Sequence, residues 1–531
     1  MLRLDNSKPH TNRVTRAALL LAGLFAIDKV VAFVRQVLIA RQFGLSSELD
    51  AFNIANNVPD MLFLLISGGG LAMAFIPVLS ETLSRDGRRA AWDLFSRIAN
   101  LAFLATLVMA AIIALLADVI VRSAVASGFT PDQQHLVINL MRLNLIATVI
   151  FSISGLVVAG LQHNQHFLLP ALAPILYNIG QIIGALFFSP TEGLTIAGVT
   201  LPTLGLGVQG LVYGVILGAL MHLGIQIPGL ARYGFRWTPR IGLSLQRDND
   251  HRLRLHGPEG VLKVLRLMGP RILTIFFIQL IFIARDNIAS HLVSGSVTAL
   301  TIGWMLMQVP ETLIGTAIGV ALLPTLSELS AAGQWEAFKG TVERAVRVLI
   351  SITLPVAAVL AAGIGPLLAL VFGFDTESTN LLLWTTRGYF AALTGHALME
   401  VASRSHYAAQ DARTPMRTGA LNLTVYLVLG LTLSNFLGAP GLSLAEAGAF
   451  TSQAVLLYIF LNRKLPQNLQ VGSSLVRGGL AAVLGAGLAL GVLWLAAPLL
   501  GQTIASVVAM LAGAALALVI VWREVRLLLH L

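Results

Sequence analysis

Cysteine is absent from the 531 residues of this chain. Its absence excludes disulfides, thiol catalysis and thiolate metal sites. Charged residues are also scarce, at 11% of the chain, whereas a soluble domain carries roughly 25%. A sequence with so little charge cannot cover a surface that faces water, so a soluble globular protein is excluded.

The motifs of common enzymes are missing as well. The sequence has no Gly-x-x-x-x-Gly-Lys-Ser/Thr phosphate loop, no His-Glu-x-x-His, no Gly-x-Ser-x-Gly and no cluster with metal-ligand spacing. We therefore expect no ATP-driven step, no catalytic residue, no metal and no bound cofactor. The net charge of +10 does not indicate nucleic acid, because the basic residues gather in the breaks between apolar segments.

Long apolar segments are what the sequence has in abundance. Hydrophobic residues make up 56% of the chain, and a helix needs about 20 apolar residues to cross a membrane. The sequence predicts an all-α integral membrane protein of about fourteen transmembrane helices. The expected spans are 16–42, 50–79, 92–122, 133–160, 167–190, 205–231, 262–293, 297–327, 341–371, 379–406, 414–436, 443–462, 475–498 and 502–522.

The positions of Lys and Arg predict the orientation of these spans. If the N-terminus is cytoplasmic, 27 of the 35 Lys and Arg residues lie on the cytoplasmic side. The extracytoplasmic loops then hold only Arg41 and Arg122. Cytoplasmic loops are the ones enriched in basic residues, so we expect both termini to be cytoplasmic.

The two halves of the sequence are related by a repeat. Residues 76–81 (IPVLSE) recur as 323–328 (LPTLSE), an offset of 247. Six helices separate the copies, so both halves point the same way, and we expect two pseudo-symmetric six-helix lobes around a central cavity. The expected divisions are an N-terminal lobe 1–240, a basic cytoplasmic linker 241–261, a C-terminal lobe 262–465 and two additional helices in 466–531.

Six basic residues lie inside the predicted helices, where a charge costs about 2.5–3.5 kcal/mol. Arg35 and Arg285 are 250 positions apart, and Arg142 and Arg387 are 245 apart, so these four match the repeat. Arginine binds phosphate bidentately, which indicates an anionic substrate such as a phosphate or pyrophosphate. Arg142 and Arg387 also lie near helix ends, where they can instead reach the interface. The remaining two, which allow both interpretations, are Lys29 and Arg271.

Acidic residues and glycines in the spans leave further alternatives open. Asp286 and Glu400 are candidates for binding a coupling ion or for structural ion pairs, and the ion pair is the favoured interpretation for Asp286. Gly68, Gly69 and Gly70 are candidates for a hinge, but glycine is also common in membrane helices for close packing alone.

Several segments resemble one known family. They are residues 33–83 (FVRQVLIARQFGLSSELDAFNIANNVPDMLFLLISGGGLAMAFIPVLSETL), 169–184 (LPALAPILYNIGQIIG), 268–270 (MGP), 294–297 (SGSV) and Gln410-Asp411 before Thr414-Pro415. In order and spacing they are similar to the MurJ/MviN proteins, bacterial flippases for the peptidoglycan precursor lipid II. That family belongs to the multidrug/oligosaccharidyl-lipid/polysaccharide exporter superfamily, and the resemblance covers the first twelve helices.

The resemblance implies alternating access, with a cationic cavity for the pyrophosphate and sugar headgroup while the lipid tail stays in the bilayer. The family's cation pair falls on Lys29 and Arg35, and its helix-two acid falls on Asp50. Two family arginines do not carry over, because Phe63 stands at one position and Met305, after Trp304, at the other. We expect Arg285 and Arg271 to compensate for them.

The resulting functional hypothesis is a flippase in the bacterial inner membrane that moves lipid II to the outer leaflet and so supports cell wall synthesis and cell shape. Either a coupling monovalent cation or the membrane potential would supply the energy. The expected partners are lipid II, membrane lipids and the cell wall synthesis machinery, and not nucleic acid. The alternatives are a flippase or exporter of another polyprenyl-pyrophosphate-linked glycan or amphiphile, and a non-transporting envelope scaffold.

Overall fold

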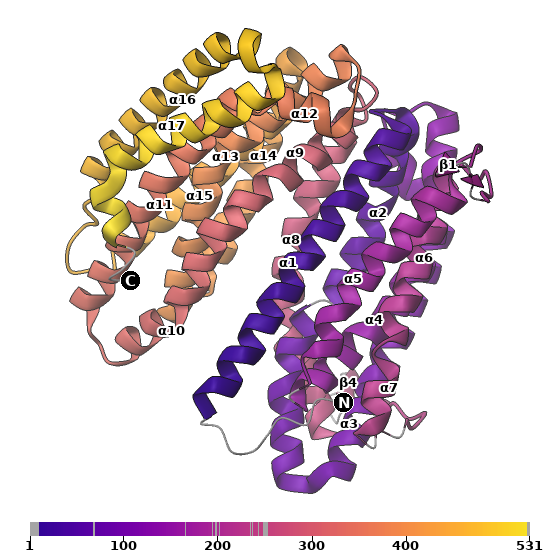
Figure 1. The fold of residues 1–531 in the computed structure, drawn as a ribbon. Helices are drawn as coiled ribbons and strands as arrows, with labels where there is room; N and C mark the ends of the chain where they lie inside the picture. Colours follow the sequence, from indigo (N-terminus) through magenta and orange to yellow (C-terminus); the bar gives the residue numbers. More distant parts are fainter. Residues whose placement is uncertain are drawn as a thin grey trace. The chain divides into compact units, whose positions relative to one another are not determined.

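The computed structural model describes residues 10–66, 69–164, 166–193, 195–196, 199–200, 202–233, 235, 237–242, 244–247, 253–256 and 258–527. This part of the chain is almost entirely helical (Figure 1). The α-helices are α1 His10–Phe43, α2 Ser47–Ile66, α3 Gly69–Ile120, α4 Pro131–His163, α5 Leu168–Ile183, α6 Val208–Gly224, α7 Ile227–Arg232, α8 Glu259–Ala289, α9 Ser296–Glu311, α10 Ala317–Ala331, α11 Trp335–Gly363, α12 Gly365–Phe372, α13 Thr376–Ala408, α14 Arg413–Leu437, α15 Ala439–Asn462, α16 Gly472–Leu500 and α17 Gln502–Val525.

Short irregular elements complete the fold. Three wider helical turns, η1 Val121–Val125, η2 Gly184–Phe188 and η3 Thr312–Thr316, continue α3, α5 and α9. Two small antiparallel hairpins pair β1 (Thr195–Ile196) with β2 (Val199–Thr200) and β3 (Ser244–Arg247) with β4 (Leu253–His256).

The chain divides into two compact units. Unit 1 comprises Met1–Gln42, Ile54–Ala124 and Thr130–Gln279, and unit 2 comprises Phe43–Asn53, Val125–Phe129 and Leu280–Leu531. Two short segments from the N-terminal half therefore belong to unit 2. The hydrogen bonds that hold them there are described with the candidate site.

Membrane-spanning character is distributed unevenly among the helices. Within the described residues, ten helical segments are long and apolar enough to cross a membrane. Four other long helices, α1, α2, α8 and α13, coincide with expected spans but are not among these ten. They hold the intramembrane residues on which the site predictions rest, among them Arg35, Asp50, Arg285 and Arg387.

Two boundaries differ from the sequence prediction. The expected spans 50–79 and 92–122 are not separated by a loop, because α3 runs from Gly69 to Ile120 with a bend at Gly87 (φ 83°, ψ 177°). Only glycine adopts this backbone conformation readily, so one residue makes the turn. The expected span 341–371 is divided at Ile364, and the shorter second helix, α12, begins with Gly365 and a proline.

Glycines bring α5 and α6 into backbone contact. A Cβ on Gly180 would lie 2.3 Å from the Gly218 Cα, and a Cβ on Gly214 would lie 2.7 Å from the Gly184 Cα. Each pair of glycines on a helix is four residues apart, the small-residue spacing that lets membrane helices approach closely. The absence of side chains at these four glycines therefore allows α5 and α6 to pack backbone against backbone.

The C-terminal helices α16 and α17 lie side by side and pack against α11 (Figure 1). Their outer faces carry large apolar side chains such as Trp494, Leu499 and Val519, which are among the most exposed in the protein. Exposed apolar faces of this extent are expected where lipid is the solvent.

We predict that Gly214→Leu destabilises unit 1, because the added side chain meets the α5 backbone, and overpacking typically costs about 1–3 kcal/mol. The measurement is the thermal unfolding midpoint in detergent. Gly224→Leu is the matched control on the same helix, since a Cβ there meets nothing within 4 Å. Equal midpoints for the two variants would contradict the glycine contact.

Candidate functional site

Arg35 on α1 and Asn178 on α5 form the centre of a polar site in unit 1. Arg35 Nη1 donates to Asn178 Oδ1 over 2.8 Å, and Asn178 Nδ2 donates to Asp28 Oδ1 over 2.9 Å. The amide of Asn178 thus accepts on one side and donates on the other, which links the cation to a carboxylate. Asp60 and Tyr177 are close enough to interact electrostatically with Arg35.

The Arg35 guanidinium keeps donors to spare. A guanidinium has five N–H donors, and the buried Nε of Arg35 has no hydrogen-bond partner among the described residues. Lys29 is exposed on the same helix, and a separation of six residues turns a side chain by about 240°, so the two cations face different directions. Arg35 has the chemistry to bind an anionic group such as phosphate.

At the two positions where the resemblance would place further arginines, the chain has Phe63 and Met305, and Met305 follows the aromatic Trp304. Phe63 on α2 contacts Phe151 on α4, with ring centroids 5.4 Å apart. In unit 2, Trp304 on α9 contacts His396 on α13 at 5.7 Å. The half-buried Met305 follows Trp304 on the same helix. These departures make both units more aromatic and less cationic than the family pattern implies.

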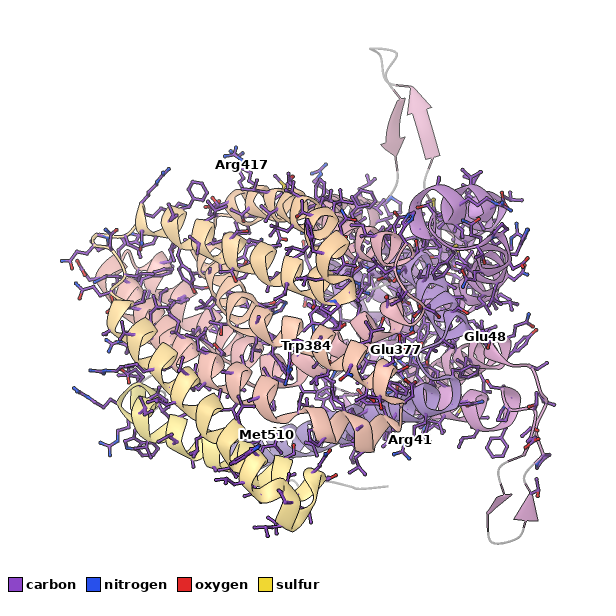
Figure 2. The ribbon with its side chains drawn as sticks, turned by 90° about the horizontal axis from the view of Figure 1, so that it is seen from above. Arg41, Glu48, Glu377, Trp384, Arg417 and Met510 are labelled. Carbon is purple, nitrogen blue, oxygen red and sulfur yellow. The ribbon has the colours of Figure 1, made fainter. Side chains whose placement is uncertain are left out.

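Arg142 and Arg387 make the same contact in the two units. Arg142 Nε donates to the backbone carbonyl of Ala114 over 3.0 Å, and Arg387 Nε donates to that of Ala361 over 2.8 Å. The two arginines are 245 positions apart and the two acceptors 247, close to the sequence repeat. Arg387 also lies over the ring of Trp384, an exposed side chain that is labelled in Figure 2. Both arginines tie neighbouring helices together.

Arg285 is buried in unit 2 with its sequence neighbour. Its Nε donates to Asp286 Oδ1 over 2.7 Å, and its guanidinium lies 5.2 Å from the centre of the Phe282 ring. Arg285 is 4% exposed, so it offers no surface to a substrate in this conformation. Glu400 pairs with Arg404 one turn along α13 at 3.1 Å. Asp286 and Glu400 are therefore both in ion pairs here.

Some predicted residues fall at the edge of what the structure describes. The Arg271 side chain lies outside the described part of the structure, although the residue belongs to α8. Gly68 lies outside the described residues, and Gly69 and Gly70 begin α3. Their hinge role stays a prediction.

Asp50 binds the N-terminus of α9. Its carboxylate accepts hydrogen bonds of 2.7 Å from the backbone N–H of Gly295 and 2.7 Å from that of Thr298, and one of 2.6 Å from the Thr298 hydroxyl. Gly295 has a left-handed backbone (φ 86°), and a Cβ there would lie 2.5 Å from Leu45 Cβ. An anion at the N-terminus of a helix is favoured by the unpaired N–H groups and the helix dipole. We call this contact the clasp.

A second set of contacts lies next to the clasp. Asn287 Nδ2 donates to the Ser127 hydroxyl over 2.9 Å, and the Gly128 N–H donates to the Ser290 hydroxyl over 3.0 Å. Ser127 is also 3.1 Å from a ring nitrogen of His291. Together with the clasp, these bonds explain why the two short N-terminal segments group with unit 2.

An apolar groove runs along unit 2 between α11 and α17. Its lining is almost free of polar surface, so it suits an acyl or prenyl chain and not an ionic headgroup. The lining residues include Pro355, Val359, Leu360, Met510, Leu511 and Leu518.

Asp411, which lies in one of the family-like segments, joins α13 to α14 and α15. Its carboxylate is 3.1 Å from His406 Nδ1, accepts from Lys464 Nζ over 2.5 Å and accepts from the Thr414 N–H over 3.0 Å. Partial burial disfavours the ionised form, but the bonds from Lys464, Thr414 and His406 outweigh it and lower the pKa of Asp411 below its ordinary value. The loop is structural.

Sequence reasoning missed two residues that the structure brings forward. Asn178 lies within the family-like segment 169–184, but nothing in the sequence shows that it faces Arg35. Glu446 on α15 is one acid among several in the spans, yet it is buried beside Arg285. A sequence pattern indicates which face of a helix a residue occupies. The residue that it contacts on another helix is seen only in the folded structure.

Spanning helices that bury charged groups in each unit define a multi-pass membrane transporter. A family model described as lipid II flippase MurJ matches residues 39–515. The chain is 29% identical over 454 residues to lipid II flippase MurJ of Burkholderia cenocepacia, covering 85% of this chain and 84% of that protein. It is 25% identical over 460 residues to probable lipid II flippase MurJ of Vibrio cholerae, covering 84% and 82%. The chain belongs to the MurJ family, whose members are transporters and not enzymes.

Solved structures share the fold. A lipid II flippase MurJ in an inward closed conformation matches with a TM-score of 0.76 at 19% identity, covering 96% of this chain and 100% of that one. An inward-facing multidrug resistance MATE family transporter of the MOP superfamily matches with a TM-score of 0.65 at 14% identity, covering 84% and 98%. The predicted all-α, multi-pass membrane fold class is confirmed.

We predict that Asp411→Asn destabilises the protein at neutral pH, because it removes the ion pair with Lys464. Hydrogen bonds to charged groups contribute about 1.5–3 kcal/mol. Since the pKa of Asp411 is lowered by folding, its contribution is present above the unfolded pKa of about 3.9 and is lost as pH falls further. Thermal midpoints of both proteins should therefore differ at pH 7 and converge in strong acid. A difference that does not change with pH would contradict this assignment.

Proposed function

We propose that this protein flips lipid II from the cytoplasmic to the outer leaflet of the bacterial inner membrane by alternating access. Membership of the MurJ family supports the substrate. The observation that carries the proposal is the Arg35 site, where a membrane-embedded guanidinium keeps unused donors. The distribution of Lys and Arg supports cytoplasmic termini.

In this proposal Arg35 binds the pyrophosphate of the substrate. One of its donors is occupied by Asn178, which is itself held by Asp28, so the guanidinium is oriented before the ligand arrives. A fixed fork loses less conformational entropy on binding than a free side chain. Asp28 and Asp60 oppose tight binding through their charge, which suits a transporter that must release its cargo.

The clasp is the element that would close the extracytoplasmic end. Asp50 and the N-terminus of α9 lie at helix ends that the predicted orientation places outside. Three hydrogen bonds to one carboxylate form a contact that can break and re-form as a unit.

A second candidate is the flipping of another polyprenyl-pyrophosphate-linked glycan or amphiphile. The observation that favours it is the aromatic character at Phe63 and Trp304, because rings can stack on sugars or apolar groups where arginine would bind charge. A non-transporting envelope scaffold is the third candidate, and it requires no function for Arg35.

The test is rescue of a bacterium depleted of its own lipid II flippase, with externalised lipid II quantified in parallel. We predict that the unmodified chain restores growth, and that Arg35→Ala and Arg35→Lys lose most of the transport while still inserting in the membrane. Asn178→Ala should lower transport less, because it releases Arg35 without removing the charge.

Arg417→Ala is the matched control, since Arg417 is exposed and points away from the helices (Figure 2). Arg285→Ala is a poor test of transport, because it would leave Asp286 buried without its partner, which typically costs 3–5 kcal/mol. Rescue by Arg35→Ala would refute the binding site. Failure of the unmodified chain, with the protein present in the membrane, would favour another lipid-linked glycan.

A further inference from the structure

A short irregular segment after α7 lies along the second half of α3 in unit 1. We call it the strap, and it consists of the described residues Tyr233, Phe235 and 237–242. Phe235 packs edge-on against Trp92 of α3, with ring centroids 5.5 Å apart. Arg88 Nη2 donates to the Tyr233 carbonyl over 2.6 Å. The strap therefore begins as a packed and hydrogen-bonded part of the fold.

Asn100 of α3 holds the rest of the strap through its side-chain amide. Its Nδ2 donates to the carbonyl of Thr238 over 2.6 Å and to that of Arg240 over 3.0 Å. Its Oδ1 accepts from the indole Nε1 of Trp237 over 2.7 Å. Both kinds of bonding group on one amide are thus used by the strap. They fix the Trp237 ring in place although this side chain is 61% exposed.

The Trp237 ring lies at one end of an exposed apolar stripe on α3. Leu104 and Leu115 lie 4 and 15 residues beyond Asn100, so they share its face of the helix, and they are 43% and 80% exposed. The exposed Asp118 lies on the same face about 27 Å from Asn100 along the helix, close to the ~30 Å of a hydrocarbon core. These spacings place Trp237 at a membrane–water interface, where tryptophan is enriched.

Three exposed arginines lie in or beside the strap. Arg240 belongs to the strap, Arg232 directly precedes it, and Arg89 follows the arginine that bonds to its first carbonyl. No ion pair of these three is found among the described residues. Asp93, the acid that contacts the strap, is already paired with Arg97 at 2.7 Å. Uncompensated positive charge beside an interfacial aromatic ring suits the headgroup of an anionic phospholipid.

We propose that the strap is a binding site for an anionic phospholipid. The Trp237 ring lies at the boundary between acyl chains and headgroups, and Arg232 and Arg240 bind the phosphate. Asn100 fixes the ring and the backbone of the strap before the lipid arrives, which lowers the entropy lost on binding. The strap leads from α7 toward α8, so a bound lipid would stabilise this connection. The inference goes beyond the proposed flipping of lipid II, because it involves no residue of the Arg35 site.

The test is a titration of the purified full-length protein in neutral detergent with phosphatidylglycerol, followed by the thermal unfolding midpoint. We expect the midpoint to rise and then saturate, because a ligand that binds the folded state stabilises it. Phosphatidylcholine has acyl chains but no net charge, and inorganic phosphate has charge but no acyl chain. Each of these should raise the midpoint much less than phosphatidylglycerol does.

Variants separate a built site from general charge attraction. Arg232→Gln combined with Arg240→Gln should need at least about tenfold more phosphatidylglycerol for half of the effect. Arg413→Gln combined with Arg417→Gln is the matched control, because it removes the same charge from exposed positions in unit 2 and should respond as the unmodified protein does. Asn100→Leu keeps every arginine but releases the strap, and it should weaken binding about fivefold.

A second measurement locates the Trp237 ring in proteoliposomes that contain brominated phosphatidylglycerol. Bromines on the acyl chains near the headgroup should quench the fluorescence of the unmodified protein more than that of Trp237→Phe. The difference between the two proteins should shrink when the bromines are placed near the chain ends, because an interfacial ring does not reach that depth.

Four results would overturn the proposal. They are equal stabilisation by phosphatidylcholine, an unchanged response in the Arg232 and Arg240 variant, an equal loss in the Arg413 and Arg417 control, and quenching that Trp237→Phe does not alter. Failure of the rescue experiment would leave all of these measurements unchanged, and it would refute only the lipid II substrate.

Discussion

The cost of an ionised group in hydrocarbon is the constraint on which the rest of this structure depends. A charge within the membrane must find a partner inside the helix bundle, and four of the embedded arginines find partners of three kinds. Arg142 and Arg387 bind backbone carbonyls, Arg285 binds Asp286, and Arg35 binds the neutral amide of Asn178. A neutral partner occupies one donor of Arg35 without forming an ion pair, and the unpaired Nε remains as a further donor.

The arginines of the sequence repeat make matching contacts at one pair of positions and different contacts at the other. The carbonyl contacts of Arg142 and Arg387 are alike, so this part of the helix packing is retained in both units. Arg35 and Arg285 occupy matching places but differ in their partners. Asn178 links Arg35 to Asp28, so this cation and acid do not bond directly. Arg285 bonds directly to Asp286, the next residue in the chain. Arg35 therefore keeps a donor to spare, whereas Arg285 is paired with the residue beside it.

The sequence was a good guide wherever the physics is local. The lengths of the apolar segments predict the membrane-spanning helices. The arginines inside those segments mark the helices that carry the candidate site. The bend at Gly87 was missed because a single residue replaced an expected loop. Partners could not be predicted, because Asn178 lies 143 positions from Arg35 and Glu446 lies 161 positions from Arg285. The resemblance places Asp50 in the substrate site, but in the structure its carboxylate is bound by the start of α9.

The clasp illustrates how a membrane protein keeps a charged group satisfied at a helix end. The Asp50 carboxylate accepts three hydrogen bonds, two of them from backbone N–H groups that begin α9, and such N–H groups have no partner within their own helix. Hydrogen bonds to a charged group contribute about 1.5–3 kcal/mol each. Any conformation in which Asp50 leaves α9 must therefore supply water or another partner both to the carboxylate and to the start of the helix.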